Sequence, residues 1–218
     1  MEKSVIQVYP SILSADFGCL AAEAKRLEKA GADAIHVDIM DGHFVPNLTL
    51  GPKALAAINK ATPLFLDVHI MIYNPYDYIE QLVQSGADRI TFHFEATEDV
   101  ADTLAFIRRC GIQAGLAFRP ETSFSMIPKH LDKCDLVLLM TVNPGFGGQE
   151  FLPDVLEKIE LTRKCMGPKF LIQVDGGINK ETAKQSVEAG ANVLVSGNYL
   201  YNQPDLAKGI QALKQVGS

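Results

Sequence analysis

The chain has 218 residues, of which 47% are hydrophobic and 21% are charged, a composition that argues against a disordered chain. Its net charge of −6, without a long basic run, argues against nucleic-acid binding. No apolar run approaches the roughly 20 residues of a membrane-spanning helix, residues 1–7 lack the apolar core of a signal peptide, and no Cys-x-x-Cys pair occurs. We therefore expect a cytoplasmic protein with reduced thiols, without a membrane or nucleic-acid partner.

Eight strand-like segments alternate with helix-like segments along the chain. The predicted strands span residues 5–13, 34–40, 64–71, 89–94, 113–118, 136–141, 170–175 and 193–196. Gly31, Gly86 and Gly190 each stand shortly before a strand, where a helix is expected to end in left-handed conformation. These glycines are 55 and 104 residues apart, close to two and four units of a βα repeat of roughly 27 residues. We predict a single α/β domain over residues 1–218, a (β/α)8 TIM barrel.

Several of these strands carry ionisable residues in an alternating pattern. In the second strand His36 and Asp38 share one face, in the third strand Asp67 and His69 do so, and the seventh strand ends in Asp175. In a barrel these faces point inward, where an unpaired charge is costly. We therefore expect the side chains to meet at matching strand ends, at the edge where barrel enzymes carry their functional groups.

The two imidazoles and two carboxylates predict a metal site. The four candidate ligands are His36, Asp38, His69 and Asp175. Buried polar residues that satisfy one another are the alternative, and for any one residue alone we would favour it. Two carboxylates placed together repel each other, however, and a divalent cation removes that repulsion. We predict one divalent cation, with Zn²⁺ favoured over Fe²⁺, Mn²⁺ or Co²⁺. Asp67 is a candidate to support a ligand histidine, and His93 is expected to be a hydrogen-bonded core residue.

Three glycine-containing segments follow the sixth, seventh and eighth strands. Their residues are Gly145, Phe146, Gly147 and Gly148, then Gly176 and Gly177, then Gly197 and Asn198. Glycine lets backbone N–H groups turn toward an anion, and a helix N-terminus adds a favourable field. Each segment alone could be an ordinary turn, but three at one end of a barrel favour a phosphate site.

Four motifs resemble those of the ribulose-phosphate 3-epimerase family. They are PSIL at 10–13, HVDIMDGHFVPN at 36–47, MTVNPGFGGQ at 140–149 and VDGG at 174–177. The resemblance covers nearly the whole chain. It implies an isomerase of the pentose phosphate pathway that interconverts D-ribulose 5-phosphate and D-xylulose 5-phosphate through a 2,3-enediolate.

The resemblance also implies roles for individual residues. His36, Asp38, His69 and Asp175 would be the metal ligands, with Asp38 as proton acceptor and Asp175 as proton donor. The substrate contacts it implies are Ser11, His69, Gly145, Phe146, Gly147, Gly148, Asp175, Gly176, Gly177, Gly197 and Asn198. The expected partner is a small ketose phosphate, and the expected assembly is a homo-oligomer.

Alternative functions remain open from the sequence. Allulose-6-phosphate 3-epimerases share the same core motifs. A lyase or aldolase of the same barrel group would carry a lysine in an Asp-x-Lys pattern, where this chain has Asp67, Val68 and His69. A protein that only binds a sugar phosphate would have no reason to keep both aspartates and both histidines.

Overall fold

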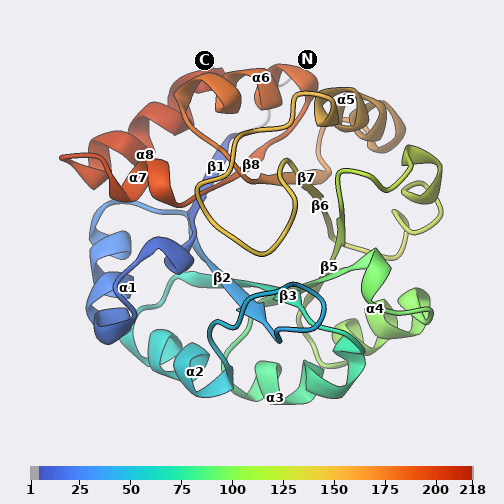
Figure 1. Cartoon of the computed structure of the whole chain (residues 1–218), viewed down its shortest axis with the longest axis horizontal. Helices are drawn as coiled ribbons and strands as arrows, with labels where there is room; N and C mark the ends of the chain where they lie inside the picture. Colours follow the sequence, from blue (N-terminus) through green and yellow to red (C-terminus); the bar gives the residue numbers. More distant parts are fainter. Residues whose placement is uncertain (1–4, 218) are drawn as a thin grey trace.

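Eight parallel strands form one sheet that curls into a barrel, and helices surround it as an outer ring (Figure 1). The computed structural model describes residues 5–217, so residues 1–4 of the segment expected to lack a signal peptide lie outside the described residues, as does residue 218. The strands are β1 (Gln7–Pro10), β2 (Ala34–Met40), β3 (Phe65–Met71), β4 (Arg89–His93), β5 (Gln113–Phe118), β6 (Leu136–Met140), β7 (Leu171–Asp175) and β8 (Val193–Ser196). Their order is β1-β8-β7-β6-β5-β4-β3-β2, and a parallel bridge between Ser11 and His36 joins the β1 and β2 edges. The predicted (β/α)8 barrel is confirmed.

The helices follow the strands in turn. They are α1 (Leu20–Lys29), α2 (Pro52–Ala61), α3 (Ile79–Gln84), α4 (Val100–Arg109), α5 (Val155–Met166), α6 (Lys180–Ala189), α7 (Asn198–Tyr201) and α8 (Leu206–Lys214). Gly31, Gly86 and Gly190 have φ of +81°, +99° and +120°, which confirms the predicted left-handed helix ends. Between β5 and β6 the chain forms a 3₁₀ turn, Phe124–Met126, in place of an α-helix. Within residues 5–217 no helix is long and apolar enough to cross a bilayer.

Seven of the predicted strands agree with the structure to within one residue at each end. The prediction for the first strand was too long, because β1 ends at Pro10 and residues Ile12–Ser14 form a 3₁₀ helix. Ser11 is the cause, since its Oγ accepts a hydrogen bond from Leu13 N and so turns the chain out of the sheet. This turn places the Ser11 side chain at the barrel mouth.

The barrel interior is divided into an apolar sector and a polar sector. On β5, β6 and β8 the buried inward side chains are apolar, among them Leu136, Leu138 and Val195. On β2, β3, β4 and β7 the inward side chains include polar residues, and the fully buried polar members are His36, Asp67, His69, Arg89, Thr91, His93 and Gln173. The outward side chains of the strands pack under the helices in the main hydrophobic core. The buried ionisable side chains of the interior therefore lie on one side of the barrel.

Arg89 is the buried cation of the polar sector, and its side chain is only 1% exposed. Its Nε donates to Asp67 Oδ1 at 2.8 Å, and its guanidinium lies over the rings of Tyr9 and Phe65. Burial raises the pKa of Asp67, but attraction to Arg89 and hydrogen bonding to His36 outweigh burial and hold that pKa well below its usual range. Asp67 is therefore a buried carboxylate that stays ionised.

Removing the cation should destabilise the fold strongly. Arg89→Ala leaves the Asp67 carboxylate buried without its charged partner, and we expect a loss of about 3–5 kcal/mol in the free energy of unfolding. Urea denaturation measures that loss. The matched control is Arg108→Ala, which breaks the Arg108–Asp135 pair, whose side chains are 43% and 36% exposed, and should cost less than about 1 kcal/mol. Equal losses in the two variants would contradict this account of the interior.

Candidate active site and metal centre

Two histidines and two aspartates meet near the barrel mouth. One ligand atom from each of His36, Asp38, His69 and Asp175 lies within 4.8 Å of the others. Asp38 Oδ1 is 3.3 Å from His36 Nε2 and 3.0 Å from His69 Nδ1. Asp175 Oδ2 is 3.8 Å and 4.0 Å from the same two nitrogens. Tetrahedral ligands about 2.0 Å from a Zn²⁺ ion are roughly 3.3 Å apart, so these atoms are near the spacing that such an ion requires.

The four residues do not all lie at strand ends, and that detail of the prediction is wrong. Asp175 is the last residue of β7, but Asp38 and His69 stand two residues before the ends of β2 and β3, and His36 lies deeper still. Asp38 and His69 are direct register partners between β2 and β3. Barrel strands are tilted and staggered, so residues at one height occupy different places along their strands.

His36 has the surroundings of a metal ligand. Its Nδ1 lies 2.8 Å from Asp67 Oδ2, and because Asp67 is ionised, Nδ1 is the donor. The other nitrogen, Nε2, is also buried and has no hydrogen-bond partner among the described residues. Such an unpartnered buried group costs about 1–3 kcal/mol, and a cation would satisfy it. Asp67 thus contacts a candidate ligand histidine, as predicted, and Gln173 Nε2 also donates to Asp67 at 2.6 Å.

The two aspartates differ in their electrostatics. Burial raises the pKa of Asp38, but attraction to His36 and hydrogen bonding to His69 outweigh burial and hold it far below its usual range. Ser11 Oγ also donates to Asp38 Oδ2 at 2.7 Å. For Asp175, burial and repulsion by Asp38 raise the pKa to about 6. Two carboxyl groups whose pKa values are pushed apart offer one base and one acid.

His69 is held from behind by a second hydrogen-bonded group. Its Nε2 lies 2.9 Å from His93 Nε2, and His93 Nδ1 lies 3.2 Å from Glu95 Oε2. Both nitrogens of His93 are partnered, as predicted for a core histidine. Glu95 Oε1 accepts from the backbone N–H of Arg119 at 2.9 Å and from the Thr122 hydroxyl. Burial lowers the pKa of His93 to about 4. Burial raises the pKa of Glu95, but hydrogen bonding to His93 outweighs burial and brings the pKa of Glu95 to about 2.

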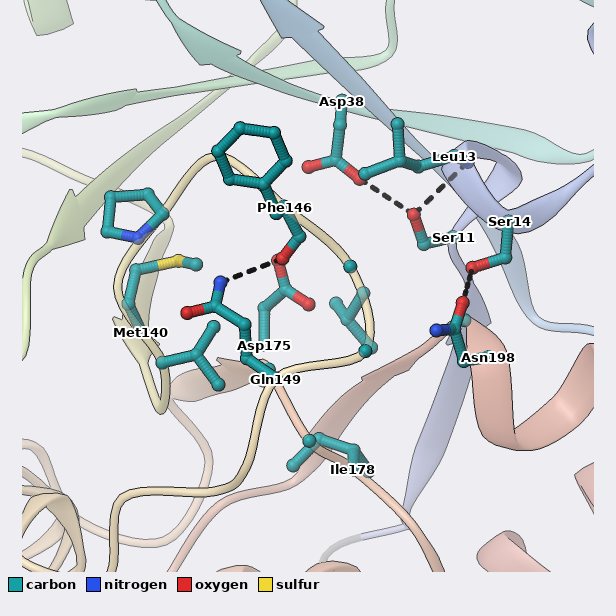
Figure 2. A pocket seen from close by; sticks show the side chains of 18 of the residues that line it. Ser11, Leu13, Ser14, Asp38, Met140, Phe146, Gln149, Asp175, Ile178 and Asn198 are labelled. Atoms are coloured by element: carbon teal, nitrogen blue, oxygen red, sulfur yellow. Dashed lines mark hydrogen bonds between the residues drawn. The ribbon is translucent and has the colours of Figure 1, made fainter. Parts of the chain in front are cut away.

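A pocket of about 390 Å³ opens beside the aspartates. The predicted substrate contacts on its wall are Ser11, Gly145, Phe146, Gly147, Gly148, Asp175, Gly176, Gly177, Gly197 and Asn198. His69 is not part of this wall, because it is fully buried next to Asp38. Figure 2 shows the Asp38 and Ser11 side chains on one side of the pocket and Asn198 with Ser14 at another. The loop that joins β6 to α5 crosses the barrel mouth (Figure 1).

Several residues of the pocket wall were not predicted from the sequence. Ser14 Oγ donates to Asn198 Oδ1 at 2.7 Å and joins the segment after β1 to the end of β8. Asn179 and Thr182 form a capping box at the start of α6, which brings a helix N-terminus to the pocket. Asn179, a residue type favoured at the N-cap, was a readable signal of that helix start. Glu95 was missed as well, because it lies beyond β4 in a 3₁₀ turn, Phe94–Ala96, where strand alternation predicts nothing.

The chain is closely similar to known proteins. The model of the Ribulose-phosphate 3 epimerase family matches residues 7–201. The chain is 56% identical to the ribulose-phosphate 3-epimerase of Chlamydia pneumoniae, over 94% of this chain and 92% of that protein. It is 49% identical to the ribulose-phosphate 3-epimerase of Bacillus subtilis, over 96% and 99%.

Solved structures share the barrel at much lower identity. A 3-hexulose-6-phosphate synthase from Salmonella typhimurium superposes with a TM-score of 0.71 at 17% identity, covering 97% of this chain and 98% of that one. That likeness concerns the fold alone. From the family match and the full-length relatives, we conclude that this chain belongs to the ribulose-phosphate 3-epimerase family.

Proposed function

We propose that the protein is a metal-dependent 3-epimerase that interconverts D-ribulose 5-phosphate and D-xylulose 5-phosphate. The observation that carries this proposal is that Asp38 and Asp175, with pKa values shifted in opposite directions, line one pocket and lie next to two buried histidines. The names of the full-length relatives support the choice of substrate. The pentose phosphate pathway is the corresponding metabolic setting.

Inversion at C3 of a 2-ketose requires removal of a proton next to a carbonyl group. Asp38, which is ionised and held by Ser11, is the base that removes it from one face of the substrate. Asp175, whose pKa is raised by burial and by repulsion from Asp38, is the acid that delivers a proton to the other face. Reversal of these two roles gives the reverse reaction.

The donor set of the site suits a divalent cation. His36 Nε2, His69 Nδ1 and one oxygen each of Asp38 and Asp175 would hold it, and two nitrogens with two oxygens suit Zn²⁺, with Fe²⁺, Mn²⁺ and Co²⁺ as alternatives. Such an ion, when bound, stabilises the negative charge that develops on the substrate oxygens as the proton leaves. The aspartates then need only move protons.

The glycine segments and the start of α6 form the proposed phosphate site. Gly147 and Gly177 both line the pocket, as do Asn179 and Thr182 at the N-terminus of α6. Backbone N–H groups at glycines and at a helix start bind phosphate oxygens well. A ketose phosphate anchored here would present its carbon chain to the two aspartates on the same pocket wall.

Gly147→Val should weaken binding of the phosphate while leaving the barrel folded. A Cβ at Gly147 would meet only Asn198 Oδ1, at 3.7 Å, whereas at Gly177, with φ of +65°, it would lie 2.7 Å from Phe151 N and strain the fold. The valine side chain would keep the phosphate from approaching the backbone N–H of residue 147. Loss of that charge-assisted hydrogen bond, worth about 1.5–3 kcal/mol, predicts a KM for the ketose phosphate that is roughly 10- to 100-fold higher. Steady-state kinetics and a melting curve check this. An unchanged KM, or equal turnover of the free ketose by the wild type, would contradict the phosphate assignment.

A substrate panel tests the proposed function. Protein loaded with one defined metal is given D-ribulose 5-phosphate and D-allulose 6-phosphate, and formaldehyde and carbon dioxide are assayed in parallel. We expect the higher kcat/KM for ribulose 5-phosphate and no release of either one-carbon product. Preference for allulose 6-phosphate would support the related epimerase instead. One-carbon release would support a lyase, although His69 stands where that group is expected to carry lysine.

A further inference from the structure

A chain of hydrogen bonds runs from Asp38 through His69 and His93 to Glu95. We propose that Glu95 and His93 are positioning residues that fix the tautomer of His69, so that its Nδ1 lone pair faces the metal site. The inference rests on the proposed function, because it concerns how the chain prepares one of the proposed metal ligands. It adds a role for two residues that do not contact the proposed ion.

The contact between the two histidines permits only two polarities. His69 Nε2 and His93 Nε2 are 2.9 Å apart, and both rings are fully buried. A hydrogen bond between two ring nitrogens needs one N–H and one lone pair. If His69 donates, its Nδ1 is free to bind a cation. If His93 donates and His69 stays neutral, His69 Nδ1 carries the proton and cannot bind one.

Glu95 selects the first polarity. Its Oε1 accepts from the backbone N–H of Arg119 and from the Thr122 hydroxyl, and its low pKa keeps it ionised. An ionised carboxylate only accepts hydrogen bonds, so His93 Nδ1 must carry a proton and donate to Glu95 Oε2. The buried, neutral His93 then has a lone pair on Nε2, which accepts from His69.

The consequence appears at the metal site. With one proton on Nε2, His69 turns its Nδ1 toward Asp38 Oδ1, 3.0 Å away. A cation that displaces the proton of this Nδ1···Oδ1 hydrogen bond is then shared by the two atoms. The same logic holds at His36, whose protonated Nδ1 is fixed by Asp67. Each proposed histidine ligand is thus held by a carboxylate: His36 directly by the buried Asp67, and His69 through His93 by the half-buried Glu95.

The surroundings of His93 keep this chain of hydrogen bonds closed. The Phe44 ring packs on the His93 ring at 4.9 Å between centroids, and the Arg119 guanidinium lies 4.2 Å over the Phe44 ring. Arg119 Nη2 also donates to Phe44 O at 3.0 Å. Water therefore has little access to His93, and Glu95 remains its partner at Nδ1.

Glu95→Gln reverses the polarity with almost no change of shape. The side-chain oxygen of the variant must stay opposite the Arg119 N–H, because a backbone N–H only donates. The amide NH₂ group then faces His93 Nδ1, which has to accept. His93 Nε2 becomes the donor to His69, and the proton of His69 moves to Nδ1. Thr122→Val is the matched control, since it removes a donor to the same carboxylate oxygen without changing what faces His93.

The first measurement is metal affinity. Metal-free wild type, Glu95→Gln and Thr122→Val are titrated with Zn²⁺ at pH 8 against a chromophoric chelator. We expect roughly 10- to 100-fold weaker Zn²⁺ binding by Glu95→Gln, the usual cost of losing a supporting partner of a ligand, and wild-type binding by Thr122→Val. Equal affinities in wild type and Glu95→Gln would overturn the inference while leaving the metal site intact. A wild type that binds no Zn²⁺ would contradict the metal assignment of the proposed function.

The second measurement reads the proton directly and does not depend on metal binding. Nitrogen-15 NMR of the imidazoles in metal-free protein should show a proton on His69 Nε2 and on His93 Nδ1 in the wild type, and neither in Glu95→Gln. Loss of a negative charge would also weaken cation binding, but it would not move these protons. A wild type in which His69 Nε2 is bare, or a variant with the wild-type pattern, would overturn the inference.

Discussion

Asp38→Asn and Asp175→Asn should each lower kcat for 3-epimerisation by roughly 10²- to 10⁴-fold, the usual contribution of a general acid or base. Each replacement keeps the shape of the side chain and removes the carboxylate that moves a proton on one face of the substrate. The two variants should nevertheless differ, because each retains the other carboxylate. The retained group can still remove and return the proton on its own face.

Deuterium exchange makes that difference visible. In D₂O, each variant should introduce deuterium at C3 of one epimer only, and the two variants should label different epimers. Both aspartates are also proposed metal ligands, so the metal content of the same samples must be measured. If both metal-loaded variants label the same epimer, or if either epimerises at the wild-type rate, the assignment of one base and one acid is wrong.

Loss of a histidine ligand should remove both the metal and the activity. Purified wild type should contain about one divalent cation per chain, as a single site requires, and His36→Ala or His69→Ala should contain almost none. Elemental analysis and epimerase assays on the same preparations check this. His43→Ala is the matched control, because His43 lies exposed in the loop after β2 and should keep metal and activity.

Two results would contradict this assignment of the metal and its ligands. Full activity of wild type after exhaustive chelation, with elemental analysis confirming that the metal has gone, would remove the cation from the mechanism. In that case the reaction would need a source of charge stabilisation other than the cation. Retention of the ion by His36→Ala would instead remove His36 from the ligand set.

The strand pattern was readable from the sequence because side chains alternate with period two. That alternation puts His36 and Asp38 on the same face of β2, and Asp67 and His69 on the same face of β3. The barrel turns both faces inward. The left-handed glycines before the strands also marked the βα repeat. The end of β1 was misjudged because a local hydrogen bond to Ser11 overrides the strand pattern.

Other properties of the site depend on three-dimensional arrangement and were not readable. Asp38 and Asp175 both follow an apolar residue in a strand, yet their pKa values shift in opposite directions because His36 and His69 lie closer to Asp38. Strand stagger, which brings residues at different strand positions to one height, leaves no mark in the sequence. Glu95 reaches His69 only through His93, and no spacing rule predicts such a contact.

The most direct test of the account is one reaction of the wild-type protein. Metal-loaded enzyme is incubated with D-ribulose 5-phosphate in D₂O, and the products are followed by NMR. We expect D-xylulose 5-phosphate that carries deuterium at C3, because the proton removed by one aspartate is replaced from the solvent-equilibrated carboxyl group of the other. Failure to form D-xylulose 5-phosphate, or its formation without deuterium at C3, would contradict the account.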